Sequence, residues 1–375
     1  MIVHVTDVFA PRVGGIETQV AGLARAQAAA GERVHVLTTA APPPGGEVAR
    51  PFRVHRVAGG VLLGSTPQPL TGRAVHHLLD TLEPDVVHAH LSAVSPCAWR
   101  AVSWASRRGR PAVASVHSLW GDGIGALYRA VDRSAGWSPR VAFAPVSAVA
   151  GAPVRRAFPT ADVTVVPNGI DPRWWRVDAR PERRDGIHVV SVGRLVHRRR
   201  PLALLDVLRA AHTGAGPRLR ATIVGSGPLE RPMERYLRRH GMTGWVRLAG
   251  PTDRVGVRAL LADADVYLNA AAHESFGIAA LEARTSGLPV VALDGTGTGE
   301  FITHGREGLL AADTLSLADA VHRLAADHRL RGRISAHNRA HPPPCTWPDV
   351  LAAFDRCYRR PPHPPSPAEP DRRSP

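Results

Sequence analysis

The sequence predicts an α/β protein with two parallel-sheet domains, and two observations support this fold class. Short apolar strands alternate with longer helical patterns along the chain, which is typical of parallel sheets covered by helices on both faces. The chain has 375 residues, of which 44% are hydrophobic, and this is enough for two cores of ordinary size. We therefore expect two doubly wound domains whose ligands bind at the carboxyl ends of the strands.

The first half of the chain carries seven predicted strands, each a short apolar and β-branched run bounded by turn-forming residues. They span residues 2–6, 33–38, 54–57, 85–88, 112–117, 141–146 and 163–166. Between the first two strands, apolar residues recur at helical spacing from Ile16 to Ala24. This spacing predicts a helix over 16–29, which ends before Gly31 because glycine commonly follows a helix.

The second half repeats the pattern after a turn-rich segment at 168–172. Its predicted strands span residues 187–192, 219–224, 245–248, 266–269 and 289–293. The domain organisation that follows is an N-terminal domain at 1–168, a linker at 169–186, a C-terminal domain at 187–341, a last helix within 342–360 and a tail at 361–375. The tail is rich in Pro and Arg and is predicted to be disordered.

The composition is strongly basic, with a formal net charge of +15 and a pI of about 11.3. All 47 basic residues other than histidine are Arg. This charge favours anionic partners such as a nucleoside diphosphate, an anionic lipid or a nucleic acid.

The three cysteines are scattered, so no disulfide framework or thiolate metal site is predicted. The first strand lacks the features of a signal peptide, and no apolar run is long enough to span a bilayer. We expect a cytoplasmic protein, with peripheral contact at the inner face of the membrane left open.

Two glutamates eight residues apart follow the strand at 266–269. Glu274 is predicted to lie in the turn after the strand and Glu282 in the next helix, which Ser275, Phe276 and Gly277 open. The first amides of a helix have no intrahelical partner and carry the positive end of its dipole. Such a site can hold a phosphate or sugar hydroxyls while the carboxylates accept further hydroxyl hydrogens. The alternative is a pair of solvated glutamates beside an ordinary helix.

Glycine-rich loops follow three other predicted strands. Gly14-Gly15 leads into the first helix, and a glycine pair there frees the backbone to curl around a diphosphate or an acceptor group. The third glycine of a dinucleotide fingerprint is missing. Gly193-Arg194 and Gly225-Ser226-Gly227 end strands of the second half, and an arginine triplet at 198–200 follows the first of these loops.

Taken in order, these motifs resemble retaining glycosyltransferases of family 4, the glycosyl transferases group 1, which have the GT-B fold. The resemblance covers residues 2–358 and implies two Rossmann-like domains facing a central cleft, with the last helix crossing back onto the N-terminal domain. It implies transfer of a sugar from a UDP- or GDP-sugar to a glycan, a glycolipid or a small metabolite. No cofactor or metal is implied, because arginine side chains supply the positive charge at the diphosphate.

The resemblance also implies roles for individual residues. The catalytic ones are His117, beside the transferring sugar, Arg194 and Arg199, at the diphosphate, and Glu274, at the donor sugar. Donor contacts are implied for Gly15, Gly193, Gly225, Gly227, Ser275, Phe276, Gly277, Ile278 and Glu282. Acceptor contacts are implied for Gly14, Glu17 and His90. Arg199 stands where the family has a lysine.

Two sequence features offer metal ligands, and for both a simpler interpretation is preferred. His88 and His90 face the same side of a strand, and His117 ends a later strand, so the three could hold a metal. A histidine at a strand end can more simply bond a sugar hydroxyl or a phosphate. His88 is expected to have its hydrogen bonds satisfied inside the core. The Asp-x-Asp motif Asp263-Ala264-Asp265 precedes a strand and is expected to be structural.

Two other functions stay open, a nucleotide-sugar epimerase of the same fold and a non-catalytic binder of lipid or nucleic acid. The paired glutamates favour the transferase, and no nucleic-acid partner is predicted. The segment 95–110, with Trp99, Trp104 and several arginines, suits an interfacial helix near anionic lipid. The preferred alternative is an outer helix whose tryptophans pack on the sheet.

Overall fold

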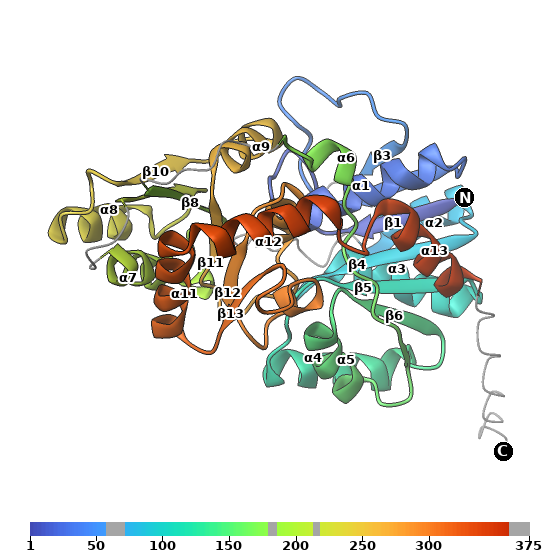
Figure 1. Ribbon diagram of the computed structural model, residues 1–375. Coiled ribbons are helices and arrows are strands. Elements are labelled where there is room, and N and C mark those ends of the chain that lie inside the picture. The colour runs from blue at the N-terminus through green and yellow to red at the C-terminus, as the bar shows by residue number, and fades with distance from the viewer. Residues whose placement is uncertain (58–71, 179–185, 213–217, 360–375) are drawn as a thin grey trace, which may run out of the picture. The chain divides into compact units, whose positions relative to one another are not determined.

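The computed structural model describes residues 1–57, 72–178, 186–212 and 218–359 (Figure 1). The chain divides into two compact units. Unit 1 comprises Met1–Gly169 and Trp347–Pro375, and unit 2 comprises Ile170–Thr346. The predicted tail at 361–375 lies outside the described residues.

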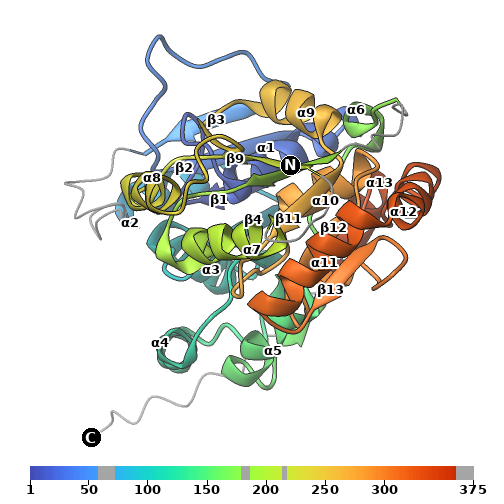
Figure 2. The same ribbon diagram turned by 60° about the vertical axis from the view of Figure 1, so that its left-hand side comes forward.

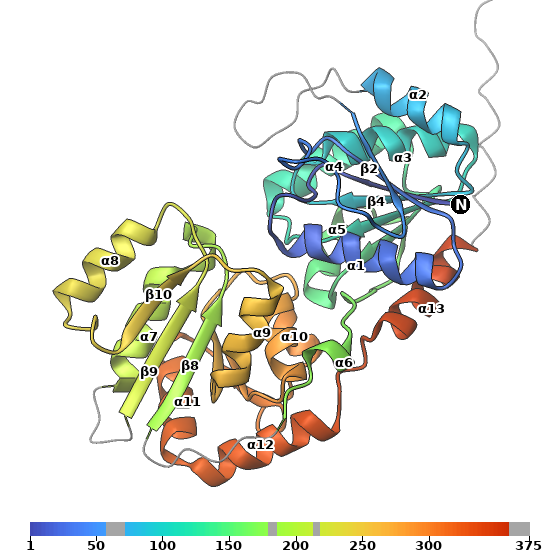
Figure 3. The same cartoon turned by 90° about the horizontal axis from the view of Figure 1, so that it is seen from above.

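Within the described residues, unit 1 contains a parallel sheet of seven strands in the order β3-β2-β1-β4-β5-β6-β7. The strands are β1 (Ile2–Thr6), β2 (Val34–Thr38), β3 (Arg53–Arg56), β4 (Val86–Leu91), β5 (Ala112–Val116), β6 (Val141–Pro145) and β7 (Asp162–Val163). The helices are α1 (Gly15–Ala29), α2 (Gly72–Leu82), α3 (Pro96–Arg108), α4 (Asp122–Ala135), α5 (Ala148–Ala157) and α13 (Trp347–Tyr358). Figure 3 shows α1 and α13 on one face of the sheet and α2 and α3 on the other.

Unit 2 contains, in its described part, a parallel sheet of six strands in the order β10-β9-β8-β11-β12-β13. The strands are β8 (Gly186–Val192), β9 (Arg218–Val224), β10 (Val246–Gly250), β11 (Val266–Asn269), β12 (Val290–Leu293) and β13 (Gly308–Ala311). The helices are α6 (Pro172–Trp175), η2 (His197–Arg199), α7 (Pro201–His212), α8 (Glu230–Arg239), α9 (Arg254–Asp263), α10 (Ile278–Thr285), η3 (Gly297–Glu300), α11 (Thr314–Ala326) and α12 (His328–Ala340). Figure 2 shows α7 and α11 side by side along this sheet.

Each sheet reverses its strand order at one place. In unit 1 this place is between β1 and β4, and in unit 2 it is between β8 and β11. At such a point the loops after the two strands turn to opposite faces of the sheet and leave a crevice at its carboxyl edge. The loops after these four strands are therefore where each unit is built to bind a ligand.

The structure differs from the predicted elements where local signals were weak. The segment predicted as a linker contains α6, which packs on α10 in unit 2, because the side chain of Trp175 is fully buried there. Strand β13 was not predicted, since a four-residue apolar run after charged residues carries little signal. The predicted helix opening at Ser275–Gly277 was wrong: α10 begins at Ile278, because Gly277 adopts a left-handed conformation with φ 94° as its N-cap.

The tryptophans of α3 pack inside unit 1. Trp104 is 5% exposed and its Nε1 donates to Asp80 at 2.8 Å, while Trp99 donates to the hydroxyl of Tyr128 at 3.0 Å. They therefore do not form the apolar face of an interfacial helix, and the outer-helix interpretation is confirmed. Among the residues that the structure describes, none of the helices combines the length and apolarity needed to cross a membrane.

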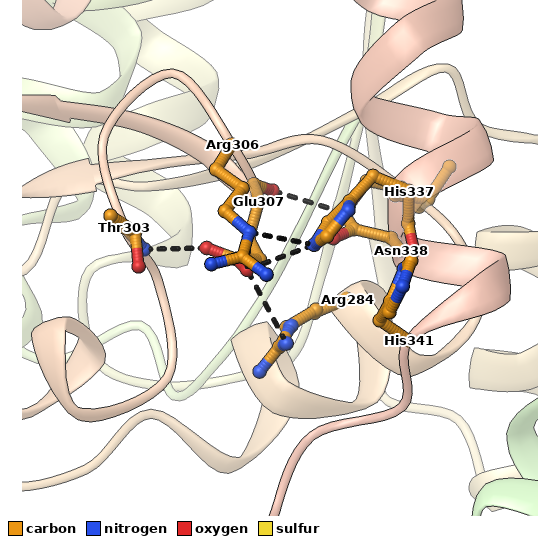
Figure 4. A network of polar contacts seen from close by, with 8 residues as sticks. Arg284, Thr303, Arg306, Glu307, His337, Asn338 and His341 are labelled. Atoms are coloured by element: carbon orange, nitrogen blue, oxygen red, sulfur yellow. Dashed lines mark hydrogen bonds and ion pairs between the residues drawn. The ribbon is translucent and has the colours of Figure 1, made fainter.

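A buried charge cluster ties α10 and α12 to the amino end of β13. Figure 4 shows Glu307 between Arg284, Arg306 and His337, with Thr303 on its other side. The Oε1 atom of Glu307 lies 3.0 Å from Nε2 of His337 and 3.7 Å from Arg284, and its Oε2 accepts from the Thr303 amide at 2.9 Å. Burial opposes ionisation of Glu307, but these hydrogen bonds and the Arg284 charge outweigh it and hold its pKa below the ordinary value.

Replacing Glu307 with glutamine should lower the free energy of unfolding by about 3 kcal/mol at pH 7, because the buried Arg284 loses its counterion. Since the folded-state pKa of Glu307 is lowered, this stabilisation is present above the unfolded pKa and is lost as the pH falls through the folded one. Urea unfolding across the acid range measures both effects. The control is Arg306→Gln, whose exposed pair with Glu307 should be worth less than about 1 kcal/mol; equal losses in the two variants would contradict the prediction.

Candidate functional site

The candidate donor site of unit 2 lies at the carboxyl edge of its sheet. Gly193 and Arg194 follow β8, the loop at 225–229 follows β9, and Glu274 follows β11. Because the strands are parallel and β8 neighbours both β9 and β11, these loops share one edge at the reversal of strand order. The residues predicted for the donor site from separate motifs thus come from neighbouring strands.

The loops after β8 and β9 are joined backbone to backbone. The Leu195 amide donates to the Ser226 carbonyl at 2.9 Å. A Cβ atom at Gly225 would lie 1.9 Å from the Gly193 carbonyl oxygen, and one at Gly227 would lie 2.5 Å from the Leu195 carbonyl oxygen. The two glycines of this loop therefore let the backbones meet, and their contribution to the site is the shape of the loop.

Replacing Gly225 with alanine should destabilise unit 2 by more than about 1 kcal/mol, because its φ of 138° and the close carbonyl both exclude a side chain. Thermal or urea unfolding measures this loss. Gly244→Ala is the matched control in the same unit, since a Cβ there would meet nothing within 4 Å, and its change should stay below about 0.5 kcal/mol. Equal stability of the two variants would show that the loop can move apart.

Glu274 and Arg199, predicted for the sugar and the diphosphate respectively, form an ion pair. Glu274 is 5% exposed, and Nδ2 of Asn269 lies 3.5 Å from the same carboxylate oxygen. Within the arginine triplet, Arg199 is thus the member paired with Glu274. Arg200 is exposed and donates to the hydroxyl of Thr314 at 3.3 Å.

The loop between Glu274 and α10 is held by the loop that follows β12. The Gly297 amide donates to the Glu274 carbonyl at 2.9 Å, and a Cβ at Gly297 would lie 2.1 Å from the Ser275 carbonyl oxygen. Phe276 is 2% exposed and anchors the loop in the core. The amides at the tip of α10 are therefore those of Ile278 and the residues after it, next to the Gly277 cap.

Glu282 lies on α10, one turn after Ile278. It is 9% exposed, and burial raises its pKa to about 8 although the charge of Arg254 acts in the opposite direction. A carboxyl group in this state keeps its proton near neutral pH until a ligand supplies hydrogen bonds to the ionised form.

Sequence reasoning missed two residues near these carboxylates. Tyr267 is fully buried and donates to the Val192 carbonyl at 3.2 Å, and burial together with the nearby charges of Glu274 and Glu282 raises its pKa. Arg254 acts on Glu282 and has its guanidinium carbon 4.7 Å from the ring centre of Trp174. The spacing of Tyr267 and Asn269 on one strand was the available signal, since both face the same side.

In unit 1, the glycine loop after β1 is shaped by its own glutamate. Glu17 is 7% exposed and pairs with Nε of Arg12 at 3.1 Å. A Cβ at Gly14 would lie 2.3 Å from its carboxylate, so Gly14 makes room for Glu17, and Gly15 begins α1. Arg56 of β3 donates to the Ala10 carbonyl at 2.8 Å and ties this loop to the edge of the sheet.

The histidines of unit 1 are hydrogen-bonded to one another. The Nδ1 atom of His90 lies 3.0 Å from Nε2 of His117, and its Nε2 lies 3.0 Å from Nδ1 of His4. His88 contacts Tyr358 and the hydroxyl of Ser115, each at 2.7 Å, so it is satisfied in the core as predicted. His90, predicted to contact the acceptor, is 3% exposed and lies behind His117.

The two sets of residues considered as metal ligands both make other contacts. His4, His88 and His90 have ring nitrogens within 4.8 Å of one another, but all six are already hydrogen-bonded to other side chains. Asp263 pairs with Arg220, and Asp265 accepts from the His188 amide. These aspartates precede β11, at the edge of the sheet opposite Glu274.

Two family models match the chain, one in each half. The model described as Glycosyltransferase Family 4 matches residues 13–174, and the model described as Glycosyl transferases group 1 matches residues 186–327. Together they include the three glycine loops, the paired glutamates, and His88, His90 and His117.

Two proteins of Mycobacterium tuberculosis are similar in sequence. Glycogen synthase is 32% identical over 258 residues, which are 65% of this chain and 61% of that protein, so this chain spans about three fifths of its length. The GDP-mannose-dependent alpha-(1-6)-phosphatidylinositol dimannoside mannosyltransferase is 28% identical over 94% of both chains.

Two solved structures share the fold. HepE from Anabaena, crystallised in complex with UDP and glucose, has a TM-score of 0.72 at 18% identity and covers 95% of this chain and 98% of its own. Sucrose-phosphate synthase from Thermosynechococcus elongatus has a TM-score of 0.75 at 20% identity and covers 96% of this chain and 98% of its own.

Proposed function

The chain belongs to the glycosyl transferases group 1 with the GT-B fold, and on that premise we propose that it transfers a sugar from a UDP- or GDP-sugar to a sugar or lipid hydroxyl with retention of anomeric configuration. The observation that carries the proposal is the pairing of Arg199 with Glu274 at the carboxyl edge of β8 and β11. It puts a cation suited to a diphosphate against a carboxylate suited to sugar hydroxyls.

Unit 2 binds the donor in this proposal. Arg194 and Arg199 stabilise the charge that the diphosphate gains as the bond to the sugar breaks. Glu274, held by Arg199 and Asn269, accepts hydrogen bonds from the hydroxyls of the donor sugar. Glu282 accepts them from the ribose. The relative crystallised with UDP and glucose supports a nucleotide-sugar donor.

In this proposal unit 1 binds the acceptor through the loop from Gly14 to Glu17, and His117 bonds a sugar hydroxyl. Glu274 is engaged with Arg199 and is poorly suited to be a nucleophile, so we favour a front-face transfer. The bond from the anomeric carbon to the phosphate oxygen breaks as the acceptor oxygen bonds the same face, and the acceptor proton passes to that phosphate oxygen. One relative is named for glycogen and another for a phosphatidylinositol dimannoside, so the proposed acceptor is either a glycan or a lipid.

The test is a screen of UDP-, GDP- and ADP-sugars without acceptor, followed by detection of the released nucleotide and sugar. A transferase releases a nucleoside diphosphate slowly by hydrolysis, and the anomer first formed reports retention. An epimerase would change the sugar and release no nucleotide. If no nucleotide raised the unfolding temperature while short DNA or anionic vesicles did, the chain would be a binder, as the basic composition alone suggests.

Activity should persist after treatment with EDTA, because the cations at the diphosphate are Arg194 and Arg199. The rate of sugar release by the treated enzyme is compared with the rate of the same sample after addition of Mg²⁺ or Mn²⁺. The two rates should agree within about twofold. Loss of an essential electrostatic group would instead lower the rate by a factor of about a hundred or more. Loss of activity in EDTA with rescue by Mn²⁺ would reinstate a metal site.

A further inference from the structure

An open pocket of about 710 Å³ lies in unit 1 at the edge of the sheet where the strands begin. Its lining comes from residues at or before the starts of β1, β2 and β3 and from the last turn of α2. The loop from Gly14 to Glu17 and His117 follow strands of the same sheet, so the pocket is separate from them. The polar residues that the argument uses are Glu32, Arg33, His35, Arg50, Arg53 and Thr81.

The register of β2 and β3 brings cationic and imidazole side chains together at this edge. His35 and Arg53 are partners in the parallel pair, so their side chains leave the same face of the sheet about 5 Å apart. His55 is two residues beyond Arg53 and faces the same side. Arg33 immediately precedes β2. Two exposed guanidinium groups and two imidazoles therefore surround the starts of these strands.

Positive charge predominates in the lining of the pocket. Arg33, Arg50 and Arg53 form no ion pair with any residue that the structure describes, and the buried Nε atom of Arg50 has no hydrogen-bond partner among them. The carboxylate that lines the pocket is that of Glu32, which is exposed. Asp85 lies near Arg33 but is already bonded to the N-terminal amino group. Three guanidinium groups thus face one carboxylate.

The imidazoles of His35 and His55 form a hydrogen-bonded pair beside these arginines. Nδ1 of His35 lies 2.9 Å from Nε2 of His55, and the two rings are stacked. Burial, and then the charges of His55, Arg53, Arg33 and the N-terminal amino group, lower the pKa of His35 to about 4. From α2 the pocket is lined by Thr81 and an uncharged leucine. The pair is therefore neutral in a positive potential, which an anion would reverse.

We propose that this pocket binds the phosphate group of a small soluble phosphate ester, held by Arg33 and Arg53 beside the pair of His35 and His55. The planar guanidinium fork matches phosphate oxygens in a bidentate manner. The volume is within the range of pockets that hold small organic ligands, so there is room for the esterified part. The histidine pair takes up a proton on an outer ring nitrogen as the anion binds, which leaves the bond between the rings intact. The inference does not rest on the proposed function.

The test follows the ring ¹⁵N signals of His35 and His55 in the full chain labelled at histidine, assigned by their absence from His35→Gln and His55→Gln. Inorganic phosphate and glycerol 3-phosphate are titrated at constant ionic strength, so that screening does not change. Both signals should shift to saturation, and the ester should bind at least as tightly as the free ion. In Arg33→Gln combined with Arg53→Gln, half-saturation should need at least about tenfold more phosphate, because two charge-assisted contacts are lost.

Arg129→Gln is the matched control, because Arg129 is an exposed arginine of α4 in the same unit and does not line the pocket. It should keep the wild-type half-saturation. Signals that do not move, or that move equally in the wild type and in the double variant, would overturn the proposal. Binding of the free ion without the ester would exclude the ester. A response to vesicles of anionic phospholipid without a response to soluble phosphate would overturn the proposal in favour of a membrane surface.

The histidine pair provides the second readout, measured with sulfate because the charge of sulfate is constant from pH 7 to pH 5. A bound anion raises the pKa of the pair, so by linkage the anion binds more tightly where the pair is protonated. Half-saturation should therefore fall by at least about twofold as the pH is lowered from 7 to 5. In His55→Gln this pH dependence should be weaker, while binding through Arg33 and Arg53 persists. Equal half-saturation at the two pH values in the wild type would overturn the proton uptake.

Discussion

Replacing Arg199 with alanine should reduce turnover about 10²–10³-fold, the usual cost of removing one preorganised donor to a developing charge. The same change should also destabilise unit 2, because Glu274 is 5% exposed and loses its paired cation. A buried carboxylate without its partner costs about 3 kcal/mol. Initial rates and urea unfolding of one sample measure the two effects.

Three variants separate chemistry from stability. Arg199→Ala combined with Glu274→Gln should regain most of the stability and none of the activity. Arg194→Ala, at an exposed position in the same loop after β8, should lose activity with little loss of stability. Arg200→Asn is the control within the triplet, since asparagine tolerates the φ of 51° at that position, and it should keep wild-type turnover. Normal turnover of Arg199→Ala would remove Arg199 from the diphosphate site.

The fold could be predicted because its signals are local. Each strand is a short apolar run, and the alternation with helices dictates parallel sheets whatever their order. The gathering of Arg194, Arg199 and Glu274 could also be predicted, because all three follow strands, and neighbouring parallel strands end at one edge of the sheet. The pairing of Arg199 with Glu274 could not be predicted, because it depends on how the η2 turn positions one of three arginines.

The hydrogen bonds that join His4, His90 and His117 could not have been predicted for a different reason. His4 stands alone in an apolar strand, and only the register of β1 on β4, which sets it opposite His88, gives it a partner. Gln27 and Tyr358 are ordinary residues of two helices whose packing on each other depends on the complete fold. Gln27 and Tyr358 are 331 residues apart, and no spacing within the sequence predicts a contact between residues so far apart.

Glu282 should lower the free energy of unfolding as the pH rises from 6.5 to 8, and Glu282→Gln should abolish this contribution. Burial raises the folded-state pKa of Glu282 from 4.5 to about 8. Between these values the unfolded state has released the proton and the folded state retains it, so the free energy of unfolding decreases by up to about 1.4 kcal/mol for each pH unit. The stabilisation that this linkage contributes is complete below pH 4.5 and is lost by about pH 8.

The difference between matched variants isolates this carboxyl group from the other buried groups. Burial raises the pKa of Asp7 to about 6, and it lowers the pKa of histidines such as His4 and His117 in the folded chain. Because an unfolded histidine still binds protons near pH 6.5, these groups add a pH dependence of their own, which the variants share. Urea unfolding at four pH values should therefore give a slope for the wild type and for Glu234→Gln, an exposed control in the same unit. The slope for Glu282→Gln should be more positive than the slopes of the other two proteins by up to about 1.4 kcal/mol for each pH unit, and equal slopes in all three would show that Glu282 is ionised in the folded chain.

Saturating UDP should also reduce the contribution of Glu282 to the pH dependence of the wild-type free energy of unfolding. Ribose hydroxyls that donate to Glu282 favour its ionised form, so a bound nucleotide lowers the pKa that burial had raised. The nucleotide then stabilises the chain more at pH 8 than at pH 6.5. The phosphates of UDP also titrate, but they do so equally in Glu282→Gln, and the difference between the two proteins reports the glutamate alone. A nucleotide that stabilised both proteins with the same pH dependence would place the ribose away from Glu282.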